Sequence, residues 1–160
     1  MSTVDDYASG RVLEGVKKTE QMIDDFNRTK DSKIRNALKE KSKDSERYHF
    51  LADMTELEAL IRNAQKVAIG PRVCLEIHQD CKQPMDSVFL DELAGALVSV
   101  GKARKATKKE ASLLLKKGLE NGYPHIVTIV SGRPLELCNT CNECCVLWKR
   151  EKLGIKCIRK

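Results

Sequence analysis

Four cysteines lie within eight positions of the segment LELCNTCNECCVLW, residues 135–148. They are Cys138, Cys141, Cys144 and Cys145, and the only tryptophan, Trp148, follows them directly. This crowding constrains the fold strongly, because the chain must place several reactive thiols side by side. Spacers of two residues let a turning backbone aim successive thiols at one point, as in the first three ligands of a ferredoxin-type [4Fe–4S] cluster. The segment therefore predicts a metal centre at this end of the chain.

The usual fourth cysteine of such a run, three residues further on and followed by proline, is absent here. Cys157 is far away, and the adjacent pair Cys144 and Cys145 would rarely both reach one cluster. We therefore expect a thiol of the upstream segment RVCLEIHQDC to complete the same centre and Cys157 to be dispensable. The candidate ligands are Cys74, Cys81, Cys138, Cys141, Cys144 and Cys145, with His78 as an occasional ligand between the upstream cysteines.

Zinc is the main alternative to an iron–sulfur cluster. Tetrahedral zinc sites usually pair two C-x2-C knuckles across a long loop. The C-terminal run with Cys74 or Cys81, or these two cysteines with His78, would supply such a set. However, seven cysteines exceed what one zinc ion needs. The pattern thus favours a [4Fe–4S] cluster, with zinc second and a thiol–disulfide or persulfide role third.

Composition and charge limit the cellular compartments and partners that suit this sequence. An odd number of cysteines argues against a pure disulfide framework. The polar start MSTVDDYASGRVLEG shows no signal peptide, and no apolar run is long enough for a membrane span. We therefore expect a cytoplasmic protein whose thiols stay reduced. The net charge of +6 comes almost wholly from the residues after position 65, where it would balance thiolates or attract an acidic partner.

The sequence predicts an α+β fold that is mostly helical and has two parts. Residues 1–52 predict a helical arm with one apolar stripe at helical spacing, formed by Val12, Val16, Thr19, Ile23 and Phe26. We expect this stripe to be buried against the body or a second chain. The arm would then dock a redox partner protein or form a homo-oligomer.

Residues 53–160 predict the cysteine-rich metal-binding domain. The pattern T-x-x-E is typical of a capping box that opens a helix, and it occurs at Thr55 and at Thr107. The other elements expected here are a strand at 66–70, a helix from Asp86 or Ser87 to Gly101, and a hairpin formed by HIVTIV, the turn SGRP and LELC.

A basic helix directly before a hairpin is also typical of a winged helix-turn-helix module. The helix expected at 108–121 carries Lys108, Lys109, Lys116 and Lys117, and the turn carries Arg133. Bases are read mainly by Arg, Asn, Gln, Ser or Thr, whereas lysines serve phosphates or solvation. Nucleic acid is therefore the less favoured partner, and a zinc-stabilised winged-helix module is the alternative function.

The stretch from VAIGPRVC to NTCNECCVLW resembles small [4Fe–4S]-binding proteins and ferredoxin-like modules of anaerobic microbes, over about residues 66–150. The resemblance implies an iron–sulfur protein that acts in electron transfer or as an accessory redox subunit, more than as an independent enzyme, and no catalytic residue is assigned. The matching pieces are Gly70-Pro71, Cys74, Cys81, Lys109-Glu110-Ala111, His125 and the run from Cys138-Asn139 to Cys145.

Overall fold

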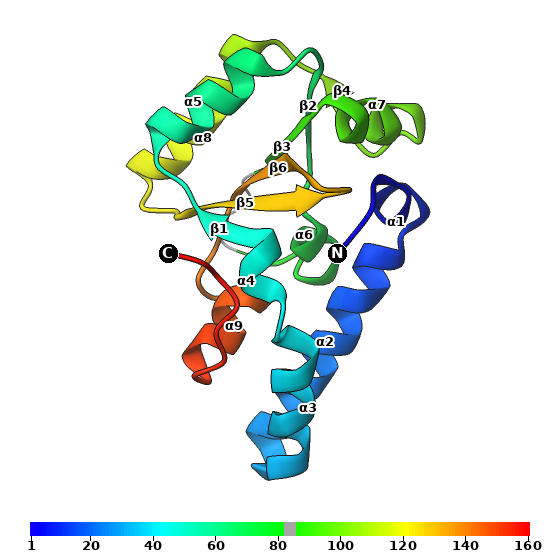
Figure 1. Cartoon of the computed structure of the whole chain (residues 1–160), viewed down its shortest axis with the longest axis vertical. Helices are drawn as coiled ribbons and strands as arrows, with labels where there is room; N and C mark the ends of the chain where they lie inside the picture. Colours follow the sequence, from blue (N-terminus) through cyan, green and yellow to red (C-terminus); the bar gives the residue numbers. More distant parts are fainter. Residues whose placement is uncertain (82–85) are drawn as a thin grey trace.

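The computed structural model describes residues 1–81 and 86–160 and has the predicted α+β fold (Figure 1). Its centre is a six-stranded antiparallel sheet in the order β1-β5-β6-β3-β2-β4. The strands are β1 (His49–Leu51), β2 (Val67–Gly70), β3 (Ser87–Leu90), β4 (Arg104–Lys105), β5 (His125–Val130) and β6 (Arg133–Asn139).

Helices cover the sheet on both faces and extend beyond it (Figure 1). They are α1 (Val4–Ser9), α2 (Arg11–Thr29), α3 (Ser32–Ser42), α4 (Ser45–Tyr48), α5 (Met54–Asn63), α6 (Val73–Ile77), α7 (Asp91–Ser99), α8 (Lys108–Glu120) and α9 (Val146–Lys152). Among the residues that the structure describes, none of these helices has both the length and the apolar character needed to cross a membrane.

The register of β6 decides what each face of the sheet carries. Leu137 lies opposite Val127 on β5 and Val88 on β3, whereas Cys138 lies opposite Ile126 and Ser87. Side chains alternate between the two faces of a strand, so Leu137 and Cys138 point in opposite directions. The face of Leu137 is called the packed face below, and the face of Cys138 the hollow face.

Helices α5 and α8 cover the packed face, where Leu115, Val127 and Leu137 are fully buried in one hydrophobic cluster. The predicted capping box at Thr107 opens α8, because its hydroxyl accepts from the Glu110 N–H while the Glu110 carboxylate accepts from the Thr107 N–H. Close contact with the sheet also explains a glycine in α8. A Cβ on Gly118 would lie 1.9 Å from Asn139 Oδ1.

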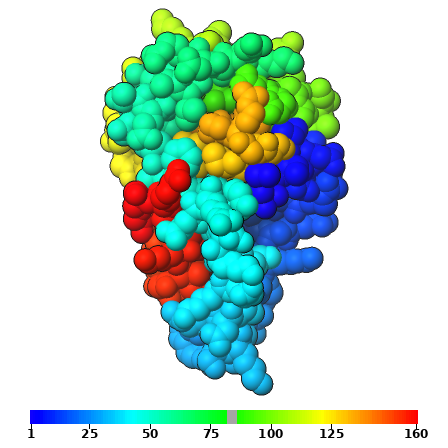
Figure 2. Space-filling view, in the orientation of Figure 1, coloured from blue at the N-terminus to red at the C-terminus, as the bar shows by residue number. Residues whose placement is uncertain are grey.

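The hollow face is covered by α1, α2, α6 and α9, which come from three distant parts of the chain. Ile23 on α2 packs with Ile126 on β5 and Leu147 on α9. Thr19 and Ile23 of the predicted stripe are buried, whereas its other three residues are half-buried. Figure 2 shows the N-terminal helices, blue to cyan, lying beside the C-terminal segment in red. Below them α2 and α3 form a helical hairpin that projects from the sheet (Figure 1).

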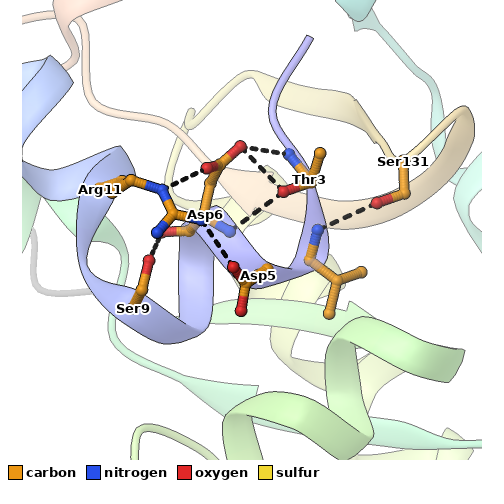
Figure 3. A network of polar contacts seen from close by, with 7 residues as sticks. Thr3, Asp5, Asp6, Ser9, Arg11 and Ser131 are labelled. Carbon is orange, nitrogen blue, oxygen red and sulfur yellow. Dashed lines mark hydrogen bonds and ion pairs between the residues drawn. The ribbon is translucent and has the colours of Figure 1, made fainter.

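Helix α1 is tied to the β5–β6 turn by its own N-terminus (Figure 3). Thr3 and Asp6 form a capping box, and Arg11 bonds to the Asp6 carboxylate. The free N–H of Val4 donates to Ser131 Oγ at 3.0 Å. These contacts hold α1 over the end of the hairpin, next to the hollow face.

Two expected elements differ from the structure. The helix expected from Asp86 or Ser87 begins at Asp91, since Ser87–Leu90 is strand β3, paired with both β2 and β6. Four consecutive buried positions suit a central strand, and periodicity alone does not separate such a strand from a buried helix. Helix α5 is capped by Asp53, not by Thr55, because the Asp53 carboxylate accepts from the Glu56 N–H.

The predicted hairpin is confirmed as β5 and β6, but it is not a free wing. Strand β6 also pairs with β3, which places the hairpin inside the sheet. The winged-helix form of the fold is therefore not confirmed.

Candidate metal centre

Three thiols from two distant segments meet beside the end of β6. The Sγ atoms of Cys81, Cys141 and Cys144 all lie within 4.8 Å of one another. Cys81 follows α6, and the other two lie in the turn between β6 and α9. Cys141 is buried and its two partners are half-buried, so the group lies just below the surface. We call Cys81, Cys141 and Cys144 the turn thiols.

Hydrogen bonds fix the turn that presents these thiols. The Thr140 N–H and hydroxyl both donate to the carbonyl of Pro124, which ties the end of β6 to the start of β5. The indole N–H of Trp148 donates to Thr140 Oγ1 at 2.9 Å. The Cys145 N–H donates to the Cys141 carbonyl, and α9 starts there. The turn is thus held from both sides, while its thiols remain at one edge.

The spacing of the turn thiols suits one bound metal ion. A tetrahedral ion with metal–sulfur bonds of about 2.3 Å keeps its thiolate ligands about 3.8 Å apart. The Cys144 and Cys81 sulfurs are 2.6 Å apart, so they must separate by roughly 1.2 Å to share an ion. Burial raises the pKa of Cys144, and hydrogen bonds to Cys81 and Cys141 raise it further. Metal binding must therefore displace protons from these thiols.

Although Cys138, Cys141 and Cys144 are separated by two residues each, Cys138 does not lie with this group in the structure. Cys138 still belongs to β6, and its side chain points to the hollow face. The expectation that Cys138, Cys141 and Cys144 converge on one point is therefore not what the structure shows. The expectation that an upstream thiol joins the C-terminal run agrees with the position of Cys81.

The other three candidate thiols line one cavity on the hollow face. Cys74 lies on α6, Cys138 on β6 and Cys145 at the start of α9, and all three are half-buried. The cavity has a volume of about 660 Å³, and α1 and α2 form its opposite wall. We call Cys74, Cys138 and Cys145 the cavity thiols.

A buried carboxyl group shares the cavity with these thiols. Glu136 lies two positions before Cys138 on β6 and points to the same face. The Tyr7 hydroxyl donates to Glu136 Oε2 at 2.5 Å, and the Ser87 hydroxyl lies 3.4 Å from Oε1. Burial raises the pKa of Glu136, although both hydrogen bonds oppose the shift. The neutral acid is thus favoured more than at an exposed site.

Arg72 lies between the two groups of thiols. Its side chain is only 1 % exposed, lines the cavity, and donates from Nη1 to the Asn139 carbonyl at 2.6 Å. Burial lowers the pKa of Arg72, but the charges of ionised Cys74, Cys138 and Cys81 raise it, and the net shift is upward. The guanidinium is therefore near thiols of both groups.

Charged side chains hold the loop that carries Cys81. The buried carboxylate of Glu20 on α2 accepts from Lys149 Nζ at 2.7 Å and contacts His78 Nε2 at 2.9 Å. The Cys81 N–H in turn donates to the His78 carbonyl. His78 thus bonds to an acid on α2, and it is not one of the turn thiols' close partners within the described residues.

Three other residues of the sequence analysis have structural roles. His125 is buried on the packed face, where Nε2 contacts Asn139 Oδ1 at 2.9 Å. Trp148 packs against the hydrophobic cluster that contains Ile23. Cys157 is fully buried in the same cluster and belongs to neither group of thiols.

Sequence reasoning missed Tyr7, Arg72 and Glu136. One signal for Glu136 was present, because the alternation of LELC places Glu136 and Cys138 on one face of the expected strand. Tyr7 and Arg72 carry no such local signal, since only the packing of α1 and α6 on the sheet brings them to it.

No family model matches the sequence, and comparisons with curated proteins and with solved structures find no match either. The function must therefore be argued from the thiols and their surroundings.

Proposed function

We propose that this protein binds an iron–sulfur cluster through its clustered cysteines and serves in electron transfer, as a carrier or as an accessory subunit of a larger redox system. The observation that carries the proposal is the meeting of Cys81, Cys141 and Cys144 within 4.8 Å. Three thiols drawn from distant segments are more than a structural core needs, and thiolates are the ligands that zinc and iron–sulfur clusters share.

The environment supports an anionic metal–thiolate centre. Metal binding converts neutral thiols into thiolates, and a thiolate at Cys81 would lie near the buried guanidinium of Arg72, whose positive charge favours it. The resemblance to small ferredoxin-like modules favours iron and sulfide over zinc at this site.

The close spacing of the turn thiols favours zinc as the second candidate, because a single ion reaches all three sulfurs. The nucleic-acid role that accompanied this alternative gains less support. On α8, Lys116 pairs with Glu58 and Lys108 donates to the Arg62 carbonyl, so two of its four expected phosphate-binding lysines contact α5 instead.

The test is metal analysis of protein purified without oxygen. We expect a brown protein with iron and acid-labile sulfide, whose visible absorption bleaches with dithionite. Cys141→Ser should lower the iron content and weaken this absorption, because it removes a turn thiol. The matched control is Cys157→Ser, which changes a buried thiol outside both groups and should keep its iron.

A colourless protein with stoichiometric zinc would support the zinc alternative instead. Full metal content in Cys141→Ser would show that the turn thiols do not form the centre.

A further inference from the structure

The cavity on the hollow face has thiols on three of its walls. Cys74 comes from α6, Cys138 from β6 and Cys145 from the start of α9, and none of them belongs to the turn thiols. Cys145 also packs against the hydrophobic cluster that contains Cys157, whereas Cys74 and Cys138 belong to neither hydrophobic cluster of the described residues. The convergence of three thiols on one cavity points to a ligand.

We infer that Cys74, Cys138 and Cys145 form a second metal centre, separate from the turn thiols, and that this centre is an iron–sulfur cluster held in the cavity. The inference deepens the proposed function and rests on it for the identity of the metal. It divides the six candidate cysteines into two sets of three.

The spacing of the cavity thiols favours a cluster over a single ion. Within the described residues the turn thiols are the one group of three whose ligand atoms all lie within 4.8 Å, so the cavity thiols are more widely spread. A single tetrahedral ion keeps its thiolates about 3.8 Å apart. A cluster distributes its cysteines over several irons, so its ligands stand further apart, and the turn thiols would have to separate to hold one. The cavity of about 660 Å³ has room for such a group.

The cavity thiols lie close enough to influence one another electrostatically. Burial raises the pKa of Cys74 to about 12, while nearby Arg72 lowers it and the charges of Cys145, Glu136 and Cys81 raise it. Burial likewise raises the pKa of Cys138, with contributions from Glu136, Cys74 and Cys145. The three thiols thus lie within one another's electrostatic range. Ionised Cys74, Cys138 and Cys81 all raise the pKa of Arg72, so one guanidinium lies near thiols of both sets.

Two double variants test the division. Cys74→Ser/Cys138→Ser alters the cavity thiols, Cys81→Ser/Cys144→Ser alters the turn thiols, and Cys157→Ser is the control. Each full-length protein is reconstituted without oxygen from ferrous iron and sulfide, and iron and sulfide are counted per folded chain. We expect each double variant to lose the iron of one centre and to keep that of the other, while the control keeps both.

Full iron content in Cys74→Ser/Cys138→Ser would overturn the second centre and leave the proposed function intact. Loss of all iron in both double variants would overturn it too, because the six thiols would then hold one shared cluster. Failure of the unaltered protein to take up iron would contradict the proposed function itself. The three failures are thus distinguishable.

A measurement on the unaltered protein covers the case in which a double variant does not fold. Two reduced clusters on either side of Arg72 would interact magnetically, so we expect a split or broadened electron paramagnetic resonance spectrum. A simple spectrum that integrates to one spin per chain would overturn the second centre.

Arg72 gives an independent test. Arg72→Gln removes a positive charge beside both centres, so both reduction potentials should become more negative, since an added electron is then less stabilised. Arg72→Lys keeps the charge and should shift them less. A shift confined to one potential would contradict the placement of Arg72 between two centres.

Discussion

The two faces of the β5–β6 hairpin are built from the same strands but differ in packing and in polarity. On the packed face, Val127 and Leu137 are fully buried against α5 and α8, and a glycine in α8 lets the helix approach the sheet. On the hollow face, Glu136 and Cys138 border a cavity of about 660 Å³. Alternate residues of β6 therefore belong to two environments, one apolar and filled, the other polar and open.

Because of this difference, residues that stabilise the fold and residues that could bind a ligand alternate along β6. A void in a packed core costs free energy and is rare in natural proteins. On the hollow face, by contrast, Glu136 and Cys138 border open space. Substitutions on the packed face should therefore change the free energy of unfolding, and those on the hollow face should mainly change what the protein binds.

The largest expected effect comes from neighbouring residues on opposite faces. Leu137→Ala should lower the free energy of unfolding by about 2–5 kcal/mol, because it opens a void in a filled core. Cys138→Ala in the metal-free protein should cost about 1 kcal/mol or less, since a small thiol already borders open space. Urea denaturation with chelator and reductant measures both. Equal losses would refute the contrast between the faces.

A pH effect is expected on the hollow face. Burial lowers the pKa of His49 from 6.5 to about 4, and the charge of Arg150 adds to this while a bond to Ser45 opposes it. The unfolded chain then binds a proton that the folded chain does not. Stability is fully present above about pH 6.5 and falls as the pH drops towards 4, by up to about 3 kcal/mol.

The comparison with His49→Gln isolates this contribution, because other groups titrate in the same range. The free-energy difference between the two proteins should change between pH 7 and pH 4. An ordinary His49 pKa by NMR would show instead that water reaches this part of the cavity wall.

Two helical glycines sharpen the comparison further. Gly118→Ala should lower the free energy of unfolding by about 1–3 kcal/mol, because the new Cβ collides with Asn139. Gly15 lies on α2 beside the cavity, and a Cβ there meets nothing within 4 Å. Gly15→Ala should raise stability by about 0.5–1 kcal/mol, since alanine favours the helix. Thermal denaturation should show a lower melting temperature for Gly118→Ala and a higher one for Gly15→Ala. A lower melting temperature in both variants would argue that the hollow face is filled.

The last expected effect concerns the bond between α1 and the sheet. Tyr7→Phe removes the hydroxyl that donates to Glu136 and should cost about 1 kcal/mol. Tyr123→Phe is the control, because no hydrogen bond from its hydroxyl occurs within the described residues. A loss as large as that of Leu137→Ala would mean that the hollow face carries as much stability as the packed one.

Local signals predicted much of this molecule. The capping box at Thr107, the strand that ends at Gly70 and the hairpin around Ser131 are each encoded within a few residues, and all three are present. The missing fourth cysteine pointed to an upstream thiol, and Cys81 lies beside the C-terminal run.

What sequence reasoning missed depends on where strands end and how they pack. The spacing of Cys138 and Cys141 does not reveal that the first is still in β6 and the second already beyond it. The turn after Asn139 therefore separates two thiols that the pattern joins. The bond between Tyr7 and Glu136 likewise joins residues that only the tertiary fold brings together.

The two outer strands of the sheet determine how this molecule can meet other chains. At one edge, the backbone of β1 bonds to Arg159, whose N–H donates to the His49 carbonyl and whose carbonyl accepts from the Leu51 N–H. At the other edge, β4 consists of the exposed pair Arg104–Lys105. Covered edges, short edge strands and positive side chains all discourage pairing with a foreign strand. Association by extension of the sheet is thus disfavoured at both ends.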